Sequence, residues 1–359
     1  MNFFKSGFFK NKKVLITGNT GFKGSWLTQV LLMTGVKIFG FALKPNTNPS
    51  LFEILKQEDE IEQIYGDIRN FAQVNESVKK FKPDIIFHLA AQPIVRLSYD
   101  NPLYTYETNT LGTANILEAI RVNQVRAGVV ITTDKVYKNT ENSTYFKEED
   151  ALGGFDPYSS SKSCADLITE SYLKSFFNVN DYGKKHFTLI CSARAGNVIG
   201  GGDWAKDRLV PDLIRAFFTE NKKLTSRNPK SIRPWQFVLE PLSGYIALAE
   251  KLYQGDISKS GAWNFGPEKK DIIPVEQIIK IFIRKLKKGE YIIEENAIKH
   301  EDKVLRLDIS KAKKELGWKP KYDIKQAVEE TAVWYETYYR QKRKIKTITT
   351  DQIKKYFEE

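Results

Sequence analysis

A tyrosine and a lysine four residues apart, Tyr158 and Lys162, form the side-chain pair in this sequence with the clearest catalytic chemistry. They open a predicted long helix after Asp156-Pro157, and residues at i and i+4 share one helix face. An ammonium beside a phenol favours the ionised phenolate, which makes Tyr158 a candidate general base near neutral pH. The same spacing also occurs by chance as an exposed helix pair, so the surrounding fold must decide between the two interpretations.

A second polar cluster, Thr132-Thr133-Asp134-Lys135, ends the apolar run GVVITT at 128–133. If that run is a parallel strand, the cluster lies at its carboxyl end, where open α/β sheets place their active sites. Asp134 and Lys135 are also compatible with a plain ion pair at a strand end.

Glycines at 18, 21 and 24 stand between the apolar run KVLIT and an amphipathic segment. Gly18 permits a tight turn, Gly21 lets the backbone approach a pyrophosphate, and Gly24 allows close helix packing. The free N–H groups at the start of the following helix favour phosphate. The turn, which includes Asn19 and Phe22, therefore predicts a dinucleotide-binding site.

The second predicted strand ends without a carboxylate, in Phe41-Ala42-Leu43-Lys44. An acidic residue at this place usually binds the adenosine ribose. Lys44 is compatible with a solvated position or with the 2′-phosphate of NADP, so these residues leave NAD and NADP open. Asp67 and Ile68, after the next strand, suit a contact with adenine; a loop cap is the alternative for Asp67.

The elements that must position these groups alternate over the first two hundred residues. Apolar, β-branched runs predict strands at 13–17, 36–42, 64–68, 84–90, 128–133 and 187–193. Apolar residues at intervals of three and four predict helices at 22–35, 71–81 and 110–122. This alternation predicts an α/β fold with a Rossmann-type, doubly wound parallel sheet.

The alternation stops after Arg194, where a glycine-rich loop and shorter mixed elements lead to a helix near 323–342. We expect a dinucleotide-binding domain of residues 1–193, to which 235–260 return. A smaller mixed α/β domain of residues 194–234 and 261–359 is expected to bind the substrate.

Composition excludes several classes of protein. The 359 residues are 41% hydrophobic and 28% charged, as in globular proteins and unlike disordered or fibrous ones. No apolar stretch approaches the roughly 18 residues of a membrane span, and the N-terminus lacks a signal-peptide pattern, so we expect no membrane partner and a cytoplasmic location.

Charge and metal-ligating residues give no sign of nucleic acid or metal. The net charge is +12, but lysine and arginine are spread along the chain, which favours solvated helix faces and a modest attraction for anionic small molecules. Cys164 and Cys191 are predicted to be free, buried thiols. The three histidines lack the close pairing of zinc sites, so no metal is expected, and His88 is predicted to be a core histidine.

Taken together, the glycine motif, HLAAQ at 88–92, TTDKVY, YSSSK and RAGNVIGGGDW resemble the extended short-chain dehydrogenase/reductase family that modifies nucleotide sugars. The resemblance covers nearly the whole chain. GFKGSW, DRLVPD, RPWQFVLEPLSGY and LGWKP are most similar to those 4,6-dehydratases of the family that act on CDP-glucose. This resemblance implies a redox-neutral reaction cycle with NAD: oxidation of the sugar at C4, loss of water across C5 and C6, and return of hydride to C6.

The same resemblance gives roles to the catalytic residues. Tyr158 takes the proton of the C4 hydroxyl, Thr133 hydrogen-bonds that oxygen, and Asp134 protonates the departing C6 hydroxyl. Lys135 stands where related dehydratases carry Glu. It acts either as a neutral base at C5, if burial and Lys162 lower its pKa, or as a stabiliser of the enolate.

The resemblance also assigns binding residues. The residues assigned to NAD are those of the glycine turn together with Asp67, Ile68, Leu89, Ala90, Ala91, Tyr158 and Lys162. Within the turn, Asn19 replaces the His that is common in the CDP-glucose enzymes. The nucleotide sugar is assigned to Gln92, Arg96, Asn197, Arg208, Arg233, Trp235 and Arg306, because the planar fork of arginine can bind two diphosphate oxygens at once. Trp235 either stacks on the base or packs between the domains. In the family that the chain resembles, two helices of each subunit often form a four-helix interface, so the resemblance implies a homodimer or a higher homo-oligomer built through the segments 101–122 and 157–177.

Two other functions stay open. A nucleotide-sugar epimerase or reductase shares the fold, but a 4-epimerase needs no acid for a departing hydroxyl, so Asp134 beside Lys135 favours elimination. A non-catalytic dinucleotide sensor or nucleic-acid-binding protein needs no activated phenol, which Tyr158 and Lys162 would provide.

Overall fold

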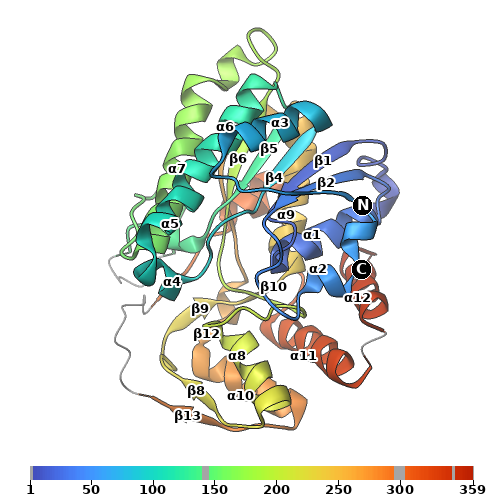
Figure 1. Ribbon diagram of the computed structural model, residues 1–359. Coiled ribbons are helices and arrows are strands. Elements are labelled where there is room, and N and C mark those ends of the chain that lie inside the picture. Colours follow the sequence, from blue (N-terminus) through green and yellow to red (C-terminus); the bar gives the residue numbers. More distant parts are fainter. Residues whose placement is uncertain (1–2, 140–144, 295–303, 342–343, 359) are drawn as a thin grey trace.

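The structure, a computed structural model, describes residues 3–139, 145–294, 304–341 and 344–358. Seven parallel strands form the sheet in the upper part of Figure 1, in the order β11-β6-β5-β4-β1-β2-β3. Their bounds are β1 Lys13–Thr17, β2 Lys37–Ala42, β3 Glu62–Tyr65, β4 Ile85–His88, β5 Ala127–Ile131, β6 Leu189–Ala195 and β11 Gly261–Phe265. The predicted Rossmann-type, doubly wound sheet is confirmed.

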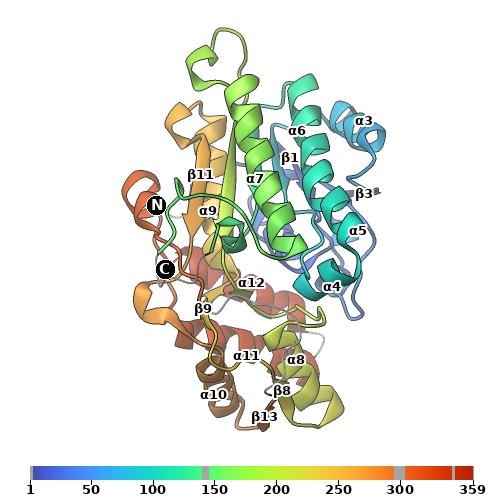
Figure 2. The same ribbon diagram turned by 90° about the vertical axis from the view of Figure 1, so that its left-hand side faces the viewer.

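Helices cover both faces of this sheet, which explains why its inner strands, such as β1, β4 and β5, are nearly continuously apolar rather than alternating. Val14 and Ile16 pack into the cluster on the side of helices α1 (Phe22–Leu32) and α9 (Leu239–Tyr253), whereas Leu15 between them faces the other cluster. That second side carries α3 (Phe71–Phe81), α6 (Gly112–Val122) and α7 (Pro157–Ser175), which Figure 2 brings to the front.

The sheet extends farther along the chain than the predicted strands. Strand β11 adds to its edge beside β6, although it lies in the segment 261–359 that we expect in the second domain. GAWNF escapes a strand prediction because it is short, begins with glycine and contains a buried asparagine, Asn264, which accepts a hydrogen bond from Tyr137. Helix α9 packs on β5 and β6, within the segment 235–260 that is expected to return to the sheet. The division into two domains stays a prediction.

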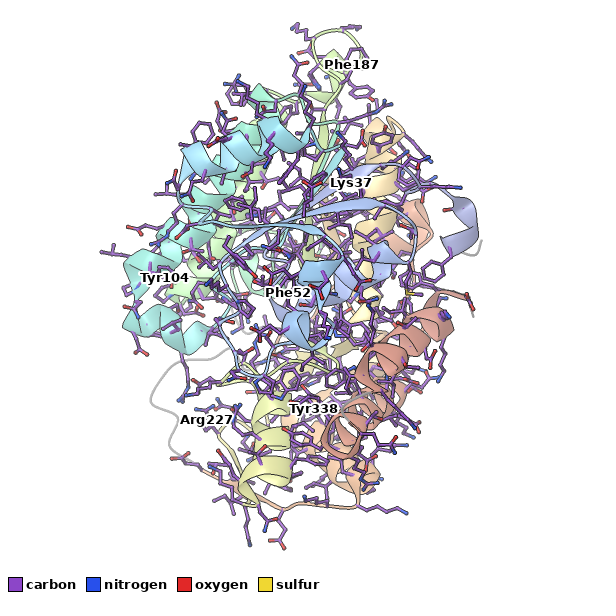
Figure 3. All side chains as sticks on the ribbon, turned by 45° about the vertical axis from the view of Figure 1, so that its right-hand side comes forward. Lys37, Phe52, Tyr104, Phe187, Arg227 and Tyr338 are labelled. Atoms are coloured by element: carbon purple, nitrogen blue, oxygen red, sulfur yellow. The ribbon has the colours of Figure 1, made fainter. Side chains whose placement is uncertain are left out.

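Short elements form the lower lobe, where Figure 3 labels Arg227 and Tyr338. Strands pair there as β7 (Val198–Ile199) with β10 (Gln236–Phe237), β8 (Leu224–Ser226) with β13 (Tyr291–Ile293), and β9 (Ile232–Pro234) with β12 (Ile272–Pro274). The remaining helices are α2 (Leu51–Ile54), α4 (Val95–Asp100), α5 (Pro102–Tyr106), α8 (Leu209–Arg215), α10 (Val275–Leu286), α11 (Ile324–Arg340) and α12 (Ile345–Glu358). None of the helices in the described ranges has the length and hydropathy of a membrane span.

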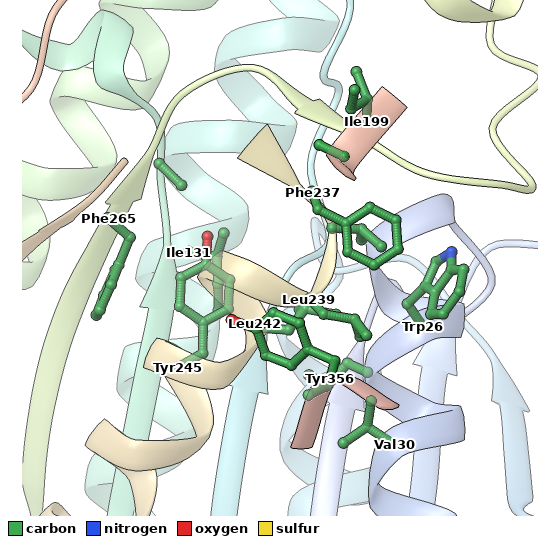
Figure 4. Packing of buried hydrophobic residues seen from close by; sticks show 14 of the residues in the cluster. Trp26, Val30, Ile131, Ile199, Phe237, Leu239, Leu242, Tyr245, Phe265 and Tyr356 are labelled. Atoms are coloured by element: carbon green, nitrogen blue, oxygen red, sulfur yellow. The ribbon is translucent and has the colours of Figure 1, made fainter. Parts of the chain in front are cut away.

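The last helix, α12, returns to the start of the chain. It contacts α1, and Tyr356 lies among Trp26, Val30 and Leu242 in the core shown in Figure 4. The Tyr356 hydroxyl donates to the buried Glu240 carboxylate of α9 at 2.6 Å, and the backbone N–H groups of Lys321 and Tyr322 donate to the same carboxylate. Burial raises the pKa of Glu240 to about 7.

Candidate active site

The glycine turn connects β1 to α1 at the point where the strand order reverses, because β1 pairs with β2 on one side and β4 on the other. Open α/β sheets bind their ligands in this crevice. Gly18 has φ +71°, and a Cβ there would lie 2.6 Å from the Ala90 nitrogen; a Cβ on Gly24 would lie 2.2 Å from the Gly18 oxygen. A Cβ on Gly21 would meet only the Gly18 oxygen, at 3.4 Å. The predicted tasks of the three glycines therefore match their surroundings.

Polar side chains behind the turn hold β1 to β4. The Thr17 hydroxyl lies 2.8 Å from His88 Nδ1, and His88 Nε2 lies 3.1 Å from the Thr113 hydroxyl. The backbone N–H of Ala90 donates to the same Thr17 hydroxyl, so Leu89 and Ala90 stand directly beside the turn. Burial lowers the pKa of His88 to about 3, which keeps it neutral. The prediction of a core histidine is confirmed.

The side chains assigned to the adenosine end are engaged with the protein. Asn19 is fully buried and donates to Gln63 Oε1 at 2.6 Å, away from the open side of the turn. The Asp67 carboxylate accepts from the backbone N–H and the guanidinium of Arg69. The Lys44 ammonium lies 5.8 Å from the centre of the Tyr65 ring. Contacts of Asp67 and Ile68 with adenine stay a prediction.

A cavity of about 300 Å³ opens between the carboxyl ends of the strands and the lower lobe. It brings together four of the five predicted catalytic residues, namely Thr133, Asp134, Lys135 and Tyr158. Five of the predicted substrate-binding residues line the same cavity: Arg96, Asn197, Arg208, Arg233 and Trp235. Residues that are far apart in the sequence thus surround one space, next to Phe22 of the glycine turn.

Local capping places the catalytic side chains. Asp156 is the N-cap of α7 and accepts from the backbone N–H and the hydroxyl of Ser159, which fixes Tyr158 in the first turn. Thr133 caps the short 3-10 turn η4 (Asp134–Val136), and its hydroxyl donates to Asp134 Oδ1 at 2.9 Å. The chain therefore presents Thr133, Asp134 and Lys135 in succession at the end of β5.

The surroundings of Tyr158 in the protein alone do not favour its ionised form. Burial raises its pKa to about 12, against the lowering effects of a hydrogen bond with Thr133 and of the nearby Arg208 guanidinium. The Lys162 ammonium instead donates to the carbonyl of Ile131 at 2.8 Å, and burial lowers the pKa of Lys162 to about 8. In the protein alone the Lys162 ammonium is thus directed to the strand end, and the ionisation of Tyr158 by Lys162 and a bound nicotinamide stays a prediction.

A buried ion pair joins the elements that carry these groups. The Asp166 carboxylate of α7 accepts from Arg194 on β6 through two guanidinium nitrogens, at 3.0 and 3.1 Å. It also accepts from the hydroxyls of Thr132, at the end of β5, and Ser192 on β6. One carboxylate therefore sets α7, with Tyr158, against the strand end that carries Thr133.

Two of the predicted substrate residues do not line the cavity. The Gln92 amide is buried and donates to the Thr105 hydroxyl and the Ile94 carbonyl. The Arg306 guanidinium lies over the Tyr145 ring, 5.5 Å from its centre. Trp235 both lines the cavity and belongs to the core, and its indole N–H has no acceptor within the described ranges, so it serves packing and faces the site at once.

Sequence reasoning missed several cavity residues, among them Lys23, Asp207 and Arg227. Asp207 accepts from Arg227 at 3.1 Å and lies 3.6 Å from Arg96 of α4, which links the two sides of the cavity. The available signal was the lysine in GFKGSW, which stands in the first turn of the helix that follows the glycine motif.

The seven-stranded sheet, the glycine turn and the Tyr158–Lys162 pair on α7 define the extended short-chain dehydrogenase/reductase fold. Solved structures share it. A dTDP-glucose 4,6-dehydratase of Bacillus anthracis in complex with NAD superposes with a TM-score of 0.74 at 24% identity, covering 93% of this chain and 99% of that one. A UDP-glucose 4-epimerase of Thermotoga maritima with UDP-glucose gives 0.77 at 18% identity, covering 90% and 99%.

The chain belongs to the GDP-mannose 4,6-dehydratase family, whose profile matches residues 15–331. It is also 46% identical to the CDP-glucose 4,6-dehydratase of Salmonella typhimurium over 335 residues, which are 93% of each chain. The predicted reaction class, a nucleotide-sugar 4,6-dehydratase and hence a hydro-lyase, is confirmed.

Proposed function

We propose that the protein is an NAD-dependent 4,6-dehydratase that converts CDP-glucose to CDP-4-keto-6-deoxyglucose and water. The observation that carries this proposal is the single cavity lined by Thr133, Asp134, Lys135 and Tyr158 beside the glycine turn. The identity to the Salmonella CDP-glucose enzyme supports the choice of nucleotide sugar.

The glycine turn fits a dinucleotide. The first turn of α1 has no side-chain cap and no acidic residue, so its N–H groups are available to a pyrophosphate. Gly18 and Gly24 leave no space for a side chain, whereas Gly21 faces open space. Leu89 and Ala90 stand beside the turn, and we assign Ala91 to the same wall. When bound, NAD supplies the acceptor and later the donor of one hydride, together with a positive charge near the phenol.

Each catalytic group then has one task. Tyr158 removes the proton of the C4 hydroxyl, and Thr133 hydrogen-bonds the same oxygen. Since burial raises the pKa of Tyr158 to about 12 in the protein alone, its ionisation depends on the positive charges of Arg208 and of the bound ligand.

Elimination follows at the neighbouring carbons, where the new 4-keto group acidifies the C5–H bond. Lys135 takes the C5 proton or stabilises the enolate, and Asp134 gives a proton to the departing C6 hydroxyl, which leaves as water. Arg208 and Arg233 hold the diphosphate of the nucleotide sugar, with Arg96, Asn197 and Trp235 lining the same cavity. Hydride would return to C6 and a proton to C5, and the proton that Tyr158 took from the C4 hydroxyl balances the one that Asp134 gave to the departing water, so no net oxidation occurs.

The test is incubation of the purified protein with NAD and CDP-, UDP-, dTDP- and GDP-glucose. Mass spectrometry should detect loss of one water from CDP-glucose, and absorbance should show no accumulation of reduced nicotinamide. A product of unchanged mass but altered stereochemistry would instead identify an epimerase. Reduced nicotinamide formed in equal amount to the product would identify an ordinary dehydrogenase.

We also propose a homodimer formed through α5, α6 and α7. Leu103 of α5 is 76% exposed and Leu167 of α7 is 50% exposed, and Leu111, in the helical turn between α5 and α6, is 58% exposed. Since α5 and α6 both pack against α7, the three leucines belong to one packed group of helical segments. Sedimentation should show a dimer that Leu103→Glu disrupts; a monomeric parent protein would refute the assignment. The cytoplasmic location stays a prediction.

A further inference from the structure

Lys23 lines the cavity, has no task in the proposed mechanism, and carries a charge that its own position in the helix does not favour. It is the second residue of α1, and cations are unfavourable in the first turn because the helix dipole is positive there. Within the described ranges its ammonium forms no hydrogen bond and no ion pair, although it lines the cavity with Asp134 and Tyr158. The Lys23 side chain is partly buried, at the wall of the cavity. A cation withdrawn from water in this way without a partner is unfavourable unless a ligand supplies the opposite charge.

The charges that face Lys23 make this need greater. The pKa of Lys23 is lowered to about 7, chiefly by its removal from water and then by the charges of Arg208 near α8 and Lys162 on α7, whereas Asp134 on η4 acts in the opposite direction. Two cations thus oppose one carboxylate around this ammonium. The arrangement becomes favourable when an anion enters between the turn and the cavity.

We infer that the Lys23 ammonium binds the diphosphate of a nucleotide ligand where the glycine turn opens into the catalytic cavity. The identity of that ligand rests on the proposed function, which brings two diphosphates to the site, one in the dinucleotide and one in the nucleotide sugar. The dinucleotide is favoured because Lys23 lies two residues after Gly21 and on the same helix turn as the uncapped N–H groups. Lys23 would also offset the absence of a carboxylate at the end of β2.

Binding of a diphosphate should be coupled to a proton. An anion beside Lys23 raises its pKa above the value of about 7 in the free protein. Above pH 7 the free lysine is partly neutral and the bound lysine is charged, so the complex takes up a proton as it forms. The affinity therefore falls as the pH rises from about 7 to the pKa of the bound state.

The experiment is calorimetric titration of the cofactor-free protein with NAD and, separately, with CDP. Lys23→Met removes the charge at similar volume, and Lys23→Arg keeps a charge that does not titrate in this range. Lys174→Met, at an exposed end of α7, is the charge-matched control. Since a charge-assisted hydrogen bond is lost, Lys23→Met should weaken NAD binding about 10- to 100-fold, and Lys174→Met should leave it unchanged.

Titrations at pH 8 in two buffers of different ionisation enthalpy should show that the parent protein takes up a proton when NAD binds. Both Lys23 variants should lose this proton uptake. If Lys23→Met weakens the binding of CDP alone, Lys23 still binds a diphosphate, but the diphosphate is that of the nucleotide sugar and not that of NAD. Parental affinity of Lys23→Met for both titrants, with proton uptake retained, would overturn the inference. If the parent protein does not bind NAD or does not dehydrate CDP-glucose, that result counts against the proposed function. It is distinguishable from failure of the inference, because it is measured without the Lys23 variants.

Discussion

Replacing Asp166 by asparagine should destabilise the protein strongly, because it leaves a buried arginine without its counter-charge. The side chains of Asp166 and Arg194 are 2% and 4% exposed, and the carboxylate accepts four hydrogen bonds, two of them from the guanidinium. Breaking a buried pair in this way costs about 3–5 kcal/mol. Two charge-assisted hydrogen bonds of about 1.5–3 kcal/mol each give a similar figure.

Urea unfolding of Asp166→Asn and of a matched control measures this cost. Glu170→Gln, one turn further along α7, removes a carboxylate that pairs with Lys174 at an exposed position, so it should cost less than about 1 kcal/mol. Turnover should fall in Asp166→Asn even at low temperature, where it is folded, because the carboxylate aligns α7 with β5. Equal stability losses in the two variants would refute the reasoning.

Three further outcomes are expected. In single turnovers with CDP-glucose, Lys135→Met should still oxidise C4 but lose water about 10²- to 10⁴-fold more slowly, whereas Tyr158→Phe should block both steps; parental elimination in Lys135→Met would leave Lys135 a structural role. Gly18→Ala should abolish NAD binding measured by calorimetry, because the added methyl would lie 2.6 Å from the Ala90 nitrogen at a φ of +71°; unaltered binding would contradict the tight turn. Glu240 has a pKa of about 7 when folded against about 4.3 when unfolded, so its contribution to stability is complete below pH 4 and is lost as the pH rises through 7. Chemical unfolding should show that the free energy of unfolding of the parent protein decreases from pH 5 to pH 8. In Glu240→Gln that decrease should be about 3 kcal/mol smaller, and equal decreases in the two proteins would contradict the assignment.

Local patterns predict the elements well where the sequence contains both the period and the stop signals. The predicted helix 71–81 coincides with α3, whose Asn70 side chain caps the first turn and whose apolar residues face the sheet. The predicted strand 64–68 lies at 62–65 instead, because the pairing ends where β2 itself ends, at Ala42, whose carbonyl accepts from the Gly66 N–H. Strand β11 escapes prediction because its pairing with β6 is set by tertiary structure.

The candidate site divides in the same way. Tyr158 and Asp134 are placed by caps and strand ends that sequence motifs display, so their meeting in one cavity could be predicted. Other features depend on the direction that each side chain takes in the folded protein. These are the hydrogen bond from the Gln92 amide to Thr105, the hydrogen bond from Lys162 to the Ile131 carbonyl, and the position of Lys23 at the cavity wall. Spacing along the chain does not contain that information.

The late arrival of β11 has a consequence for synthesis on the ribosome. When the first 260 residues have left the exit tunnel, β6 still lacks its outer neighbour, and its edge presents unpaired N–H and C=O groups beside apolar side chains. Such an edge can pair with another nascent chain, so the interval before residues 261–265 emerge is the period of greatest risk of aggregation. A fragment cut before β11 keeps that edge permanently, which makes the dinucleotide-binding half a poor candidate for separate expression.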